Sequence, residues 1–290
     1  MMNENHLSKD PTDSPAIDTW QGCMARLLNG LSIEVDPRDL IGSHILAYGA
    51  WEMDTVTFMQ DFLQVGMTII DVGANIGQHS MIASTCVGQQ GQVHAFEPHL
   101  GLFDIFNRNI QRAACKNIFP NQLALGHVEG QRLLYPHTID NLGATSFIPA
   151  TPGAGGDPVV VNVIKLDHYV MTHDIKQVDF IKIDVEGAEL EVLQGATTIL
   201  ESNPEIVLLV EFYEPNAARF GHHLNDLEAK LRSMGFHLFS ISPQGIAPYQ
   251  PVPDLCQNVI AVRQLPILLQ CLKEKDAASL LMRLAQPPAT

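Results

Sequence analysis

The stretch TIIDVGANIGQHS, at Thr68–Ser80, joins an apolar strand to a helix through Asp71, Gly73, Asn75 and Gly77. Glycine at such a turn permits unusual backbone angles and lets a ligand approach the main chain. The helix that follows offers unpaired N–H groups to an anionic group. The spacing G-x-N-x-G meets the dinucleotide fingerprint G-x-G-x-x-G only in part. A purely structural tight turn is therefore the alternative to a ligand site.

A second candidate binding residue is Glu97, which lies in VHAFEP, 26 positions after Asp71. An acidic residue at the end of the second strand accepts hydrogen bonds from ribose hydroxyls in nucleotide-binding sheets. The alternative is a solvated carboxylate in the turn before Pro98. Together, the glycine turn and Glu97 indicate a nucleoside-containing ligand more strongly than either feature alone.

The stretch FIKIDVEGAE places Lys182, Asp184 and Glu186 at every second position, so these side chains share one face of a strand. Ionisable groups at the end of a buried strand are costly unless they are paired or functional. The functional interpretation is acid–base chemistry at the carboxyl end of this strand. The structural alternative is a lysine–carboxylate ion pair, with acidic residues favourably placed at the start of the next helix.

The elements that must position these residues alternate between strand and helix. This pattern predicts a mainly parallel, doubly wound α/β sheet that binds ligands at the carboxyl ends of its strands. Two late strands, separated by a proline-rich loop, predict an antiparallel pair. We expect strands within 67–73, 92–98, 117–125, 159–167, 178–185, 205–212, 236–242 and 256–263. We expect helices at 51–64, 78–88, 101–115, 186–202 and 225–234, the last with a capping box of Asn225 and Glu228.

The chain divides into an N-terminal segment (1–47), a main domain (48–265) and a helical tail (266–290), and the first residues are expected to be poorly ordered. The formal net charge of −15 argues against a nucleic-acid partner, because phosphate binding needs clusters of Lys and Arg. Five scattered cysteines without a CxxC pair indicate a reducing compartment. The sequence has no signal-peptide pattern and no apolar run long enough for a membrane span, so we expect a cytoplasmic protein.

Taken together, DVGANIGQHS, AFEP and FIKIDVEGAELEVLQGA resemble the FkbM-type methyltransferases, with further agreement in YGAWE, ALG and NPEIVLLVEF. The resemblance covers roughly residues 48–263. It implies the class I methyltransferase fold, a Rossmann-like, doubly wound, seven-stranded sheet that is mainly parallel with an antiparallel last strand. It also implies an S-adenosylmethionine-dependent O-methyltransferase. The acceptor would be a hydroxyl of a small molecule, a sugar or glycan, or a polyketide.

The same resemblance implies where the cofactor binds. The methionine part of S-adenosylmethionine would cross the turn between Gly73 and Gly77, with its amino-acid end held by Asp71 and Asn75. Glu97 would bind the ribose. The adenine contacts stay open, and residues 121–123 are the expected region.

Methyl transfer to a neutral hydroxyl benefits from a general base, by roughly 10²–10⁴-fold. The candidate bases are Asp184, Glu186, Glu211 and His79, of which Asp184 or Glu186 is favoured for chemistry on the acceptor. Lys182 would adjust their proton affinity by pairing with them. Asp184 and Glu211 could also ligate Mg²⁺, but nothing in their spacing demands an ion, so no metal site is predicted.

Two other functions stay open at this point: an NAD-dependent oxidoreductase that uses the same glycine turn, and a non-catalytic Rossmann-like binding module. The first is weakened by the missing middle glycine, and the second by the presence of all the motif acids. The acceptor pocket is expected from the N-terminal segment and residues 130–158, where Asp140, Asn141 or Ser146 could touch the acceptor. The oligomeric state is open, and a homodimer is one of the states considered.

Overall fold

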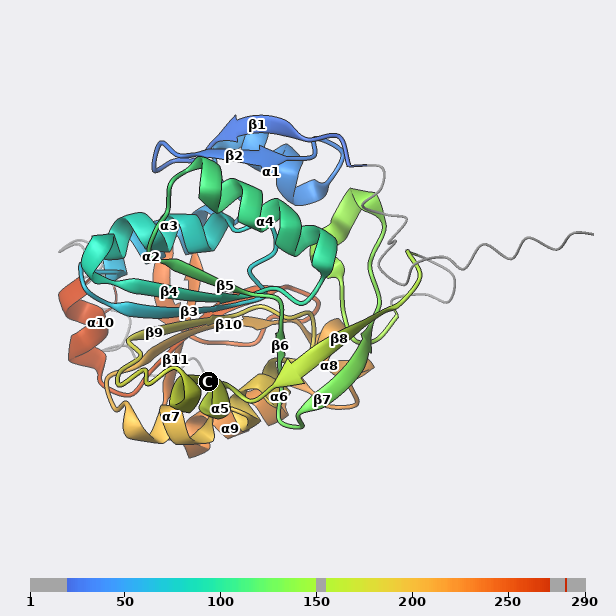
Figure 1. Ribbon diagram of the computed structural model, residues 1–290. Coiled ribbons are helices and arrows are strands. Elements are labelled where there is room, and N and C mark those ends of the chain that lie inside the picture. Colours follow the sequence, from blue (N-terminus) through green and yellow to red (C-terminus); the bar gives the residue numbers. More distant parts are fainter. Residues whose placement is uncertain (1–19, 150–154, 272–279, 281–290) are drawn as a thin grey trace, which may run out of the picture.

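The computed structural model describes residues 20–149, 155–271 and 280. Its centre is an eight-stranded sheet with the order β12-β11-β13-β10-β9-β3-β4-β5 (Figure 1). The neighbours from β10 to β5 are parallel, and β13 is antiparallel to the strands on both of its sides. This confirms the predicted α/β class and the antiparallel last strand. The bounds are β3 Thr68–Val72, β4 Gln92–Phe96, β5 Ile118–Asn121, β9 Phe180–Ile183, β10 Val207–Phe212, β11 His237–Ser242, β12 Gly245–Pro248 and β13 Gln257–Val262.

The sheet has one strand more than the seven expected, because the proline-rich loop contains β12. This strand forms a hairpin with β11, in which Ser242 pairs with Gly245. Gly245 has a φ of 96°, the left-handed conformation that a tight hairpin requires. Pro248 is tolerated because β12 is an edge strand, where a residue without an N–H group need not remove a hydrogen bond between strands.

Two hydrophobic cores cover the two faces of the sheet, because successive strand residues point to opposite sides. On β3, Ile69 joins one core and Ile70 the other, and on β9 Phe180 and Ile181 divide in the same way. Helices α2, α3 and α4 cover the first face, and α5, α6, α7 and α9 cover the second (Figure 1). The helix bounds are α1 Leu40–Tyr48, α2 Met53–Phe62, α3 Gln78–Val87, α4 Leu100–Arg112, α5 Leu166–Thr172, α6 Glu189–Gln194, α7 Thr197–Ser202, α8 Glu214–Arg219, α9 Leu224–Ser233 and α10 Leu265–Cys271.

The single helix expected over 186–202 is wrong, because the chain forms two short helices, α6 and α7. A Cβ atom on Gly195 would lie 2.1 Å from the main-chain oxygen of Gly126, so only glycine fits at the break. The carboxylate of Asp167 accepts hydrogen bonds from the N–H groups of Thr198 and Ile199, both at 2.9 Å. These bonds satisfy the free N–H groups of the new helix start.

The capping box expected at Asn225 and Glu228 is also wrong. Helix α9 starts one residue before Asn225, with His223 as its N-cap. The N–H of His223 donates to the carboxylate of Asp226 at 2.8 Å, and its Nδ1 lies 2.6 Å from an Oε1 of Glu214. These partners fix the start of the helix through a contact with α8 that sequence spacing does not reveal.

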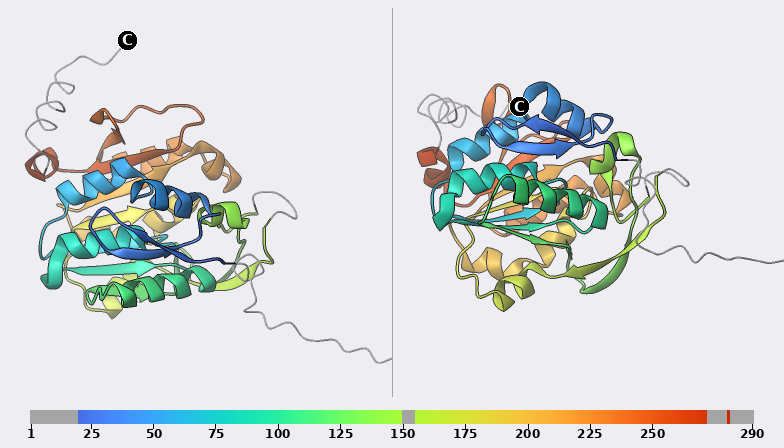
Figure 2. Two further views of the ribbon diagram at one scale, coloured as in Figure 1. Left: turned by 90° about the horizontal axis from the view of Figure 1, so that it is seen from above. Right: turned by 45° about the horizontal axis from the view of Figure 1, so that its top comes forward.

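Residues 20–48 form a hairpin, β1 (Cys23–Arg26) and β2 (Ser32–Val35), followed by α1. Figure 2 shows this unit lying over α4 and the start of α3. Glu34 connects it to α4: its carboxylate binds Arg108 at 2.8 Å and also binds Arg112, and its main-chain N–H donates to Asn109 at 2.7 Å. The expected disorder of residues 1–16 lies outside the described residues.

A small second sheet with the order β6-β8-β7 projects beside the central one. Its strands are β6 Ala124–Leu125, β7 Gly130–Leu134 and β8 Val159–Ile164, so the strand expected at 159–167 belongs here. Two 3-10 helices, η1 Gly88–Gln90 and η2 Ile139–Ala144, complete the described elements. In the C-terminal tail, Leu268 of α10 is buried in the core of the first face. No helix in the described ranges is long and apolar enough to cross a membrane.

We expect Glu34→Gln to lower the free energy of unfolding by about 1–2 kcal/mol, because hydrogen bonds to charged groups are lost but both arginines are partly exposed. Hydrogen bonds from Arg108, opposed by burial and reinforced by Arg112, lower the pKa of Glu34 from 4.5 to about 2. Since the folded state lowers this pKa, the stabilisation is complete above pH 4.5 and is lost as the pH falls toward 2.

Urea unfolding of the parent and the variant from pH 7 to pH 3 measures this difference. Glu228→Gln is the control, because it breaks an exposed pair with Arg232 on α9 and should cost only about 0.3–0.5 kcal/mol. A Glu34→Gln effect no larger than that of the control would refute the role of Glu34.

Candidate active site

The site lies at the carboxyl ends of β10, β9, β3 and β4. From β3 the chain moves outward to β4 and β5, and then returns to place β9 on the other side of β3. Ligands of open α/β sheets bind at this reversal of strand order. A cavity at this point is lined by the loops after β3, β4 and β9, by the ends of α1, α2 and α3, and by η2.

The two glycines of the turn are explained by the protein's own atoms. A Cβ on Gly73 would lie 1.8 Å from the main-chain oxygen of Asp184, and one on Gly77 would lie 2.2 Å from the ring of Phe106. Their φ values of 85° and 94° also disfavour side chains. Gly73 still lines the cavity, whereas Gly77 does not. Packing between segments is therefore sufficient to exclude side chains at both positions, and contact of the turn with a ligand stays a prediction.

Asn75 takes the place of the middle glycine of the dinucleotide fingerprint. Its φ is 51°, a left-handed conformation that asparagine tolerates better than most residues. Its side-chain oxygen accepts the N–H of Ile76 at 2.7 Å, and its own N–H donates to Glu97 at 2.9 Å. The turn is thus shaped without a third glycine, and Asn75 lines the cavity.

Glu97 lines the cavity and is buried, with 6 % of its surface exposed. Its carboxylate already accepts the N–H groups of Asn75 and of His99, the latter at 2.8 Å. A carboxylate has about four acceptor positions, so two stay available for hydroxyl groups. Burial raises the pKa of Glu97 to about 7 against these hydrogen bonds, and nearby carboxylates add to the rise.

Asp71 lies beneath the cavity, and its side chain is not part of the lining. It is 2 % exposed, and its Oδ2 accepts the hydroxyl of Ser80 at 2.5 Å, whereas its Oδ1 is buried without a hydrogen-bond partner among the described residues. Asp71 pairs in register with Lys182 on the neighbouring strand. Its direct contact with the cofactor stays a prediction.

Lys182 is the buried cation of the site, with only 2 % of its side chain exposed. Its Nζ donates to Oδ2 of Asp184 at 2.7 Å. Burial alone would lower the pKa of Lys182, but the carboxylates of Asp184, Asp71 and Glu52 raise it above its ordinary value. The predicted lysine–carboxylate ion pair therefore exists, and it keeps Lys182 charged.

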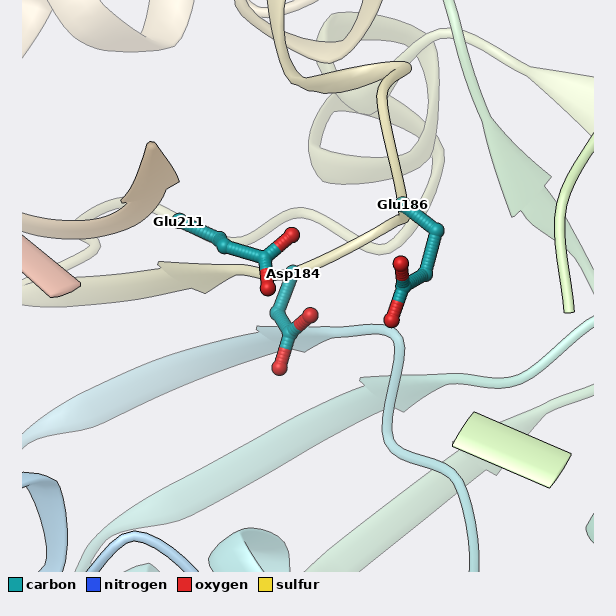
Figure 3. A group of neighbouring side chains, drawn as sticks. All are labelled: Asp184, Glu186 and Glu211. Atoms are coloured by element: carbon teal, nitrogen blue, oxygen red, sulfur yellow. The ribbon is translucent and has the colours of Figure 1, made fainter. Parts of the chain in front are cut away.

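The carboxylates of Asp184, Glu186 and Glu211 converge, with one oxygen of each within 4.8 Å of the others (Figure 3). Asp184 and Glu186 come from the loop after β9, and Glu211 comes from the end of β10. Burial and the neighbouring acids raise the pKa of Glu186 to about 8 and hold that of Glu211 well above its ordinary value. The sequence thus identified three acids that the fold does bring together.

These three acids are the side chains that could hold a metal ion among the residues the structure describes. The set has the all-oxygen chemistry that Mg²⁺ prefers. The raised pKa values of Glu186 and Glu211 give the cluster a second way to be stable, since a neutral carboxyl group does not repel its neighbours. The pair His222–His223 takes no part in this cluster, because His223 is committed to capping α9.

His79 lines the cavity but is poorly suited to act as a base. Burial, together with the positive charge of Lys182, holds the pKa of His79 well below its ordinary value. Its Nε2 lies 3.2 Å from the side-chain nitrogen of Gln78 and 3.7 Å from a carboxylate oxygen of Glu52. The imidazole is therefore neutral and already engaged.

The segments expected to form the acceptor pocket line the cavity, and binding of an acceptor there stays a prediction. Asn141, Ser146 and other residues of 134–147 line the cavity, as do Leu40 and Ile41 of α1, whereas Asp140 does not. One carboxylate, Asp39, holds the two sides together by accepting the N–H groups of Gly42 and Leu142, both at 3.0 Å.

Of the region expected to bind adenine, Leu123 lines the cavity. Asn121 does not line it, because its side-chain nitrogen binds the main-chain oxygens of Ala95 and Phe119 and the hydroxyl of Tyr169. It thus holds β5 to β4. Contact of this segment with adenine stays a prediction.

Sequence reasoning missed several residues of the site. Trp51, Glu52, Gln78 and Cys256 all line the cavity, and the thiol of Cys256 donates to Oε1 of Glu211 at 3.1 Å. A fifth, Glu189, is buried and accepts the N–H groups of Val185 and Gly187, which shapes the loop carrying the acids. The YGAWE stretch was the available signal for Trp51 and Glu52.

The family model described as the methyltransferase FkbM domain matches residues 71–238. This is more than half of the chain, and the chain therefore belongs to the FkbM methyltransferase family. The observed sheet is that of a class I methyltransferase, with one added edge strand. The interpretation as an NAD-dependent oxidoreductase is set aside.

The chain is 31 % identical over 151 residues to a hexuronic acid methyltransferase, AglP, of Haloferax volcanii, a match that covers 52 % of this chain and 59 % of that relative. It is 27 % identical over 201 residues to the methyltransferase sdnD of Sordaria araneosa, covering 59 % of this chain and 73 % of the relative. A solved precorrin-6y C5,15-methyltransferase of Geobacter metallireducens superposes with a TM-score of 0.45 at 12 % identity, over 74 % of this chain and 89 % of that one.

S-adenosylmethionine is the cofactor of this family, and the residues of the cavity fit it. The cofactor carries a sulfonium cation, and the described lining carries the acids Glu52, Glu97, Asp184, Glu186 and Glu211 beside a single ammonium group. Glu97 can accept ribose hydroxyls at its remaining acceptor positions. The turn after β3 presents the start of α3, whose N–H groups suit a carboxylate.

We expect Gly73→Ala to destabilise the protein more than Gly66→Ala. Gly66 has a similar φ of 92°, but a Cβ placed there would meet no atom within 4 Å, so its variant measures the backbone cost alone, about 1–2 kcal/mol. Gly73→Ala adds the collision with Asp184, and we expect a further loss of about 1–3 kcal/mol. Urea unfolding of both variants measures the difference. Equal losses would show that the loop after β9 moves aside freely.

Proposed function

We propose that this protein is an S-adenosylmethionine-dependent O-methyltransferase that acts on a hydroxyl of a sugar or other polyhydroxylated acceptor. The single observation that carries the proposal is the convergence of Asp184, Glu186 and Glu211 in the cavity that the family's cofactor turn also lines. Carboxylates beside a methyl donor can accept the proton of a hydroxyl group as the new bond forms.

Bound S-adenosylmethionine supplies an electrophilic methyl group, and the chain's own residues do the remaining work. The turn between Gly73 and Asn75 would hold the amino-acid end, and Glu97 would bind the ribose. Lys182 orients Asp184 through their ion pair. The carboxylate of either Asp184 or Glu186 would accept the single hydroxyl proton as the hydroxyl oxygen takes up the methyl group, and Glu211 lies beside both.

The proton affinity of Glu186 suits this task. A general base works best when its pKa is close to the operating pH, and the pKa of Glu186 is raised to about 8. The side-chain nitrogen of Asn216 donates to Glu186 at 2.6 Å, which orients the carboxyl group. Glu186 can therefore accept a proton and release it again near neutral pH.

The acceptor class is inferred from chemistry and similarity together. AglP is a hexuronic acid methyltransferase by name, so sugars are the first acceptors to test. A hydroxyl at the reacting position adds no further negative charge beside the three converging acids, whereas a carboxylate would add one. The polyketide and other small-molecule acceptors expected from the sequence stay in the same hydroxyl class.

The experiment that tests the function combines cofactor binding with turnover. We expect calorimetry to show binding of S-adenosylmethionine and S-adenosylhomocysteine but not of NAD, and labelled donor to methylate a member of a panel of neutral sugars. Glu97→Gln should weaken donor binding by about 1.5–3 kcal/mol, the value of a hydrogen bond to a charged group. Binding of NAD without a response to S-adenosylhomocysteine would contradict the proposal.

We expect Asp184→Asn to lower turnover by roughly 10²-fold or more while donor affinity changes little. The amide keeps the shape of the side chain but loses its basicity. Turnover, donor affinity and melting temperature are measured on the same sample, with Glu191→Gln as the control, because it breaks an ion pair with Arg132 that does not line the cavity.

A lower melting temperature with normal turnover per folded molecule would reduce Asp184 to half of an ion pair. Loss of the parent's activity in EDTA, restored by Mg²⁺, would instead make the three acids metal ligands. Either outcome would remove Asp184 as the base.

A further inference from the structure

The side chain of Gln78 is held in one orientation by the main chain of Trp51. The N–H of Trp51 donates to Oε1 of Gln78 at 2.6 Å, and Nε2 of Gln78 donates to the main-chain oxygen of Trp51 at 3.0 Å. Flipping the amide would set donor against donor and acceptor against acceptor. Gln78 is only 4 % exposed, so water cannot replace these partners.

This orientation determines the tautomer of His79. The second hydrogen on Nε2 of Gln78 points to Nε2 of His79 at 3.2 Å, so that ring nitrogen must be the acceptor. The carboxylate of Glu52 lies 3.7 Å from the same nitrogen, which is too far for a hydrogen bond that would favour a proton there. A neutral imidazole with an unprotonated Nε2 carries its proton on Nδ1.

The Nδ1–H group has a place to donate. His79 is buried to about nine-tenths and lines the cavity, and no hydrogen bond to its Nδ1 is found within the described part of the chain. It is the second residue of α3, a helix of 10 residues that begins at the end of the glycine turn. Main-chain N–H groups and the imidazole N–H therefore gather at one helix start.

We propose that Gln78 is a positioning residue that locks His79 as an Nδ1–H donor, and that His79 binds the carboxylate of the cofactor's amino-acid end. This rests on the proposed function. A carboxylate suits this corner, because the first turn of a helix favours negative charge. A neutral donor also adds no charge beside Lys182.

The test compares two ligands that differ in the amino-acid part. S-adenosylhomocysteine contains it, and 5′-methylthioadenosine keeps the nucleoside and the thioether without it. We expect His79→Phe to lower the affinity for S-adenosylhomocysteine by about tenfold or more, as expected for the loss of one hydrogen bond to a charged group. The affinity for 5′-methylthioadenosine should change by no more than about twofold. His79→Asn places an amide nitrogen close to the position of Nδ1 and should recover most of the loss. The ratio of the two affinities does not depend on the folded fraction.

Gln78 is tested by Gln78→Met and by ¹⁵N spectra of the imidazole. The parent should carry the proton of His79 on Nδ1, whereas Gln78→Met should show both tautomers and weaker binding of S-adenosylhomocysteine alone. His94 provides a reference signal, because Tyr169 and Gln92 occupy its two nitrogens. These readouts would not change if Gln78 only supported the fold.

Three results would overturn the assignment. Equal losses of affinity for both ligands in His79→Phe would make His79 a structural residue. A proton on Nε2 of His79 in the parent would refute the role of Gln78 in fixing the tautomer. Binding of neither ligand by the parent would overturn the proposed function, and this assignment with it.

Discussion

The buried ammonium group of Lys182 is the interaction on which the rest of the site depends. A charge taken out of water is costly unless it is paired, and Lys182 is paired with Asp184 and faces Asp71 on the next strand. Burial and the neighbouring acids raise the pKa values of Glu186 and Glu211. The cation thus forms an ion pair with one of the three converging acids, the proposed base Asp184.

The turn after β3 and the loop after β9, which carries Asp184 and Glu186, are in direct contact. The main-chain oxygen of Asp184 occupies the space where Gly73 would carry a side chain, and the N–H of Asp184 donates to Val72 at 3.1 Å. The position of each loop therefore depends on the position of the other. The same contact keeps the proposed base beside the turn that positions the donor, so that alignment of the reacting groups is built into the sheet edge.

The cavity is lined by residues inside the range that the family model matches and by residues outside that range. The matched segment, 71–238, contains the glycine turn, Glu97 and the three converging acids. Leu40, Ile41, Trp51, Glu52 and Cys256 lie outside that segment and still line the cavity. Asp39 fastens the N-terminal wall to η2. The cavity is therefore completed only when the N-terminal part of the chain and the residue before β13 pack against the matched segment.

The sequence by itself determined the α/β class and the positions of the main strands along the chain. It also located the strand ends that carry Glu97, Lys182, Asp184 and Glu186. These features depend on local periodicity and on the fact that parallel strands present their carboxyl ends at one edge. For the same reason the three acids could be expected in one place before their distances were known. The motif set was also sufficient for the family, because motif order and spacing are properties of the chain alone.

Only the tertiary structure decided what those residues can do. It placed a carbonyl oxygen and a phenyl ring where Gly73 and Gly77 would carry side chains. It packed Gly195, at the break between α6 and α7, against the main chain of Gly126, and it turned His79 from a candidate base into a buried, neutral imidazole. Steric exclusion, burial and hydrogen-bond partners are set by segments far apart in the chain. Local sequence patterns contain no record of which segments will meet.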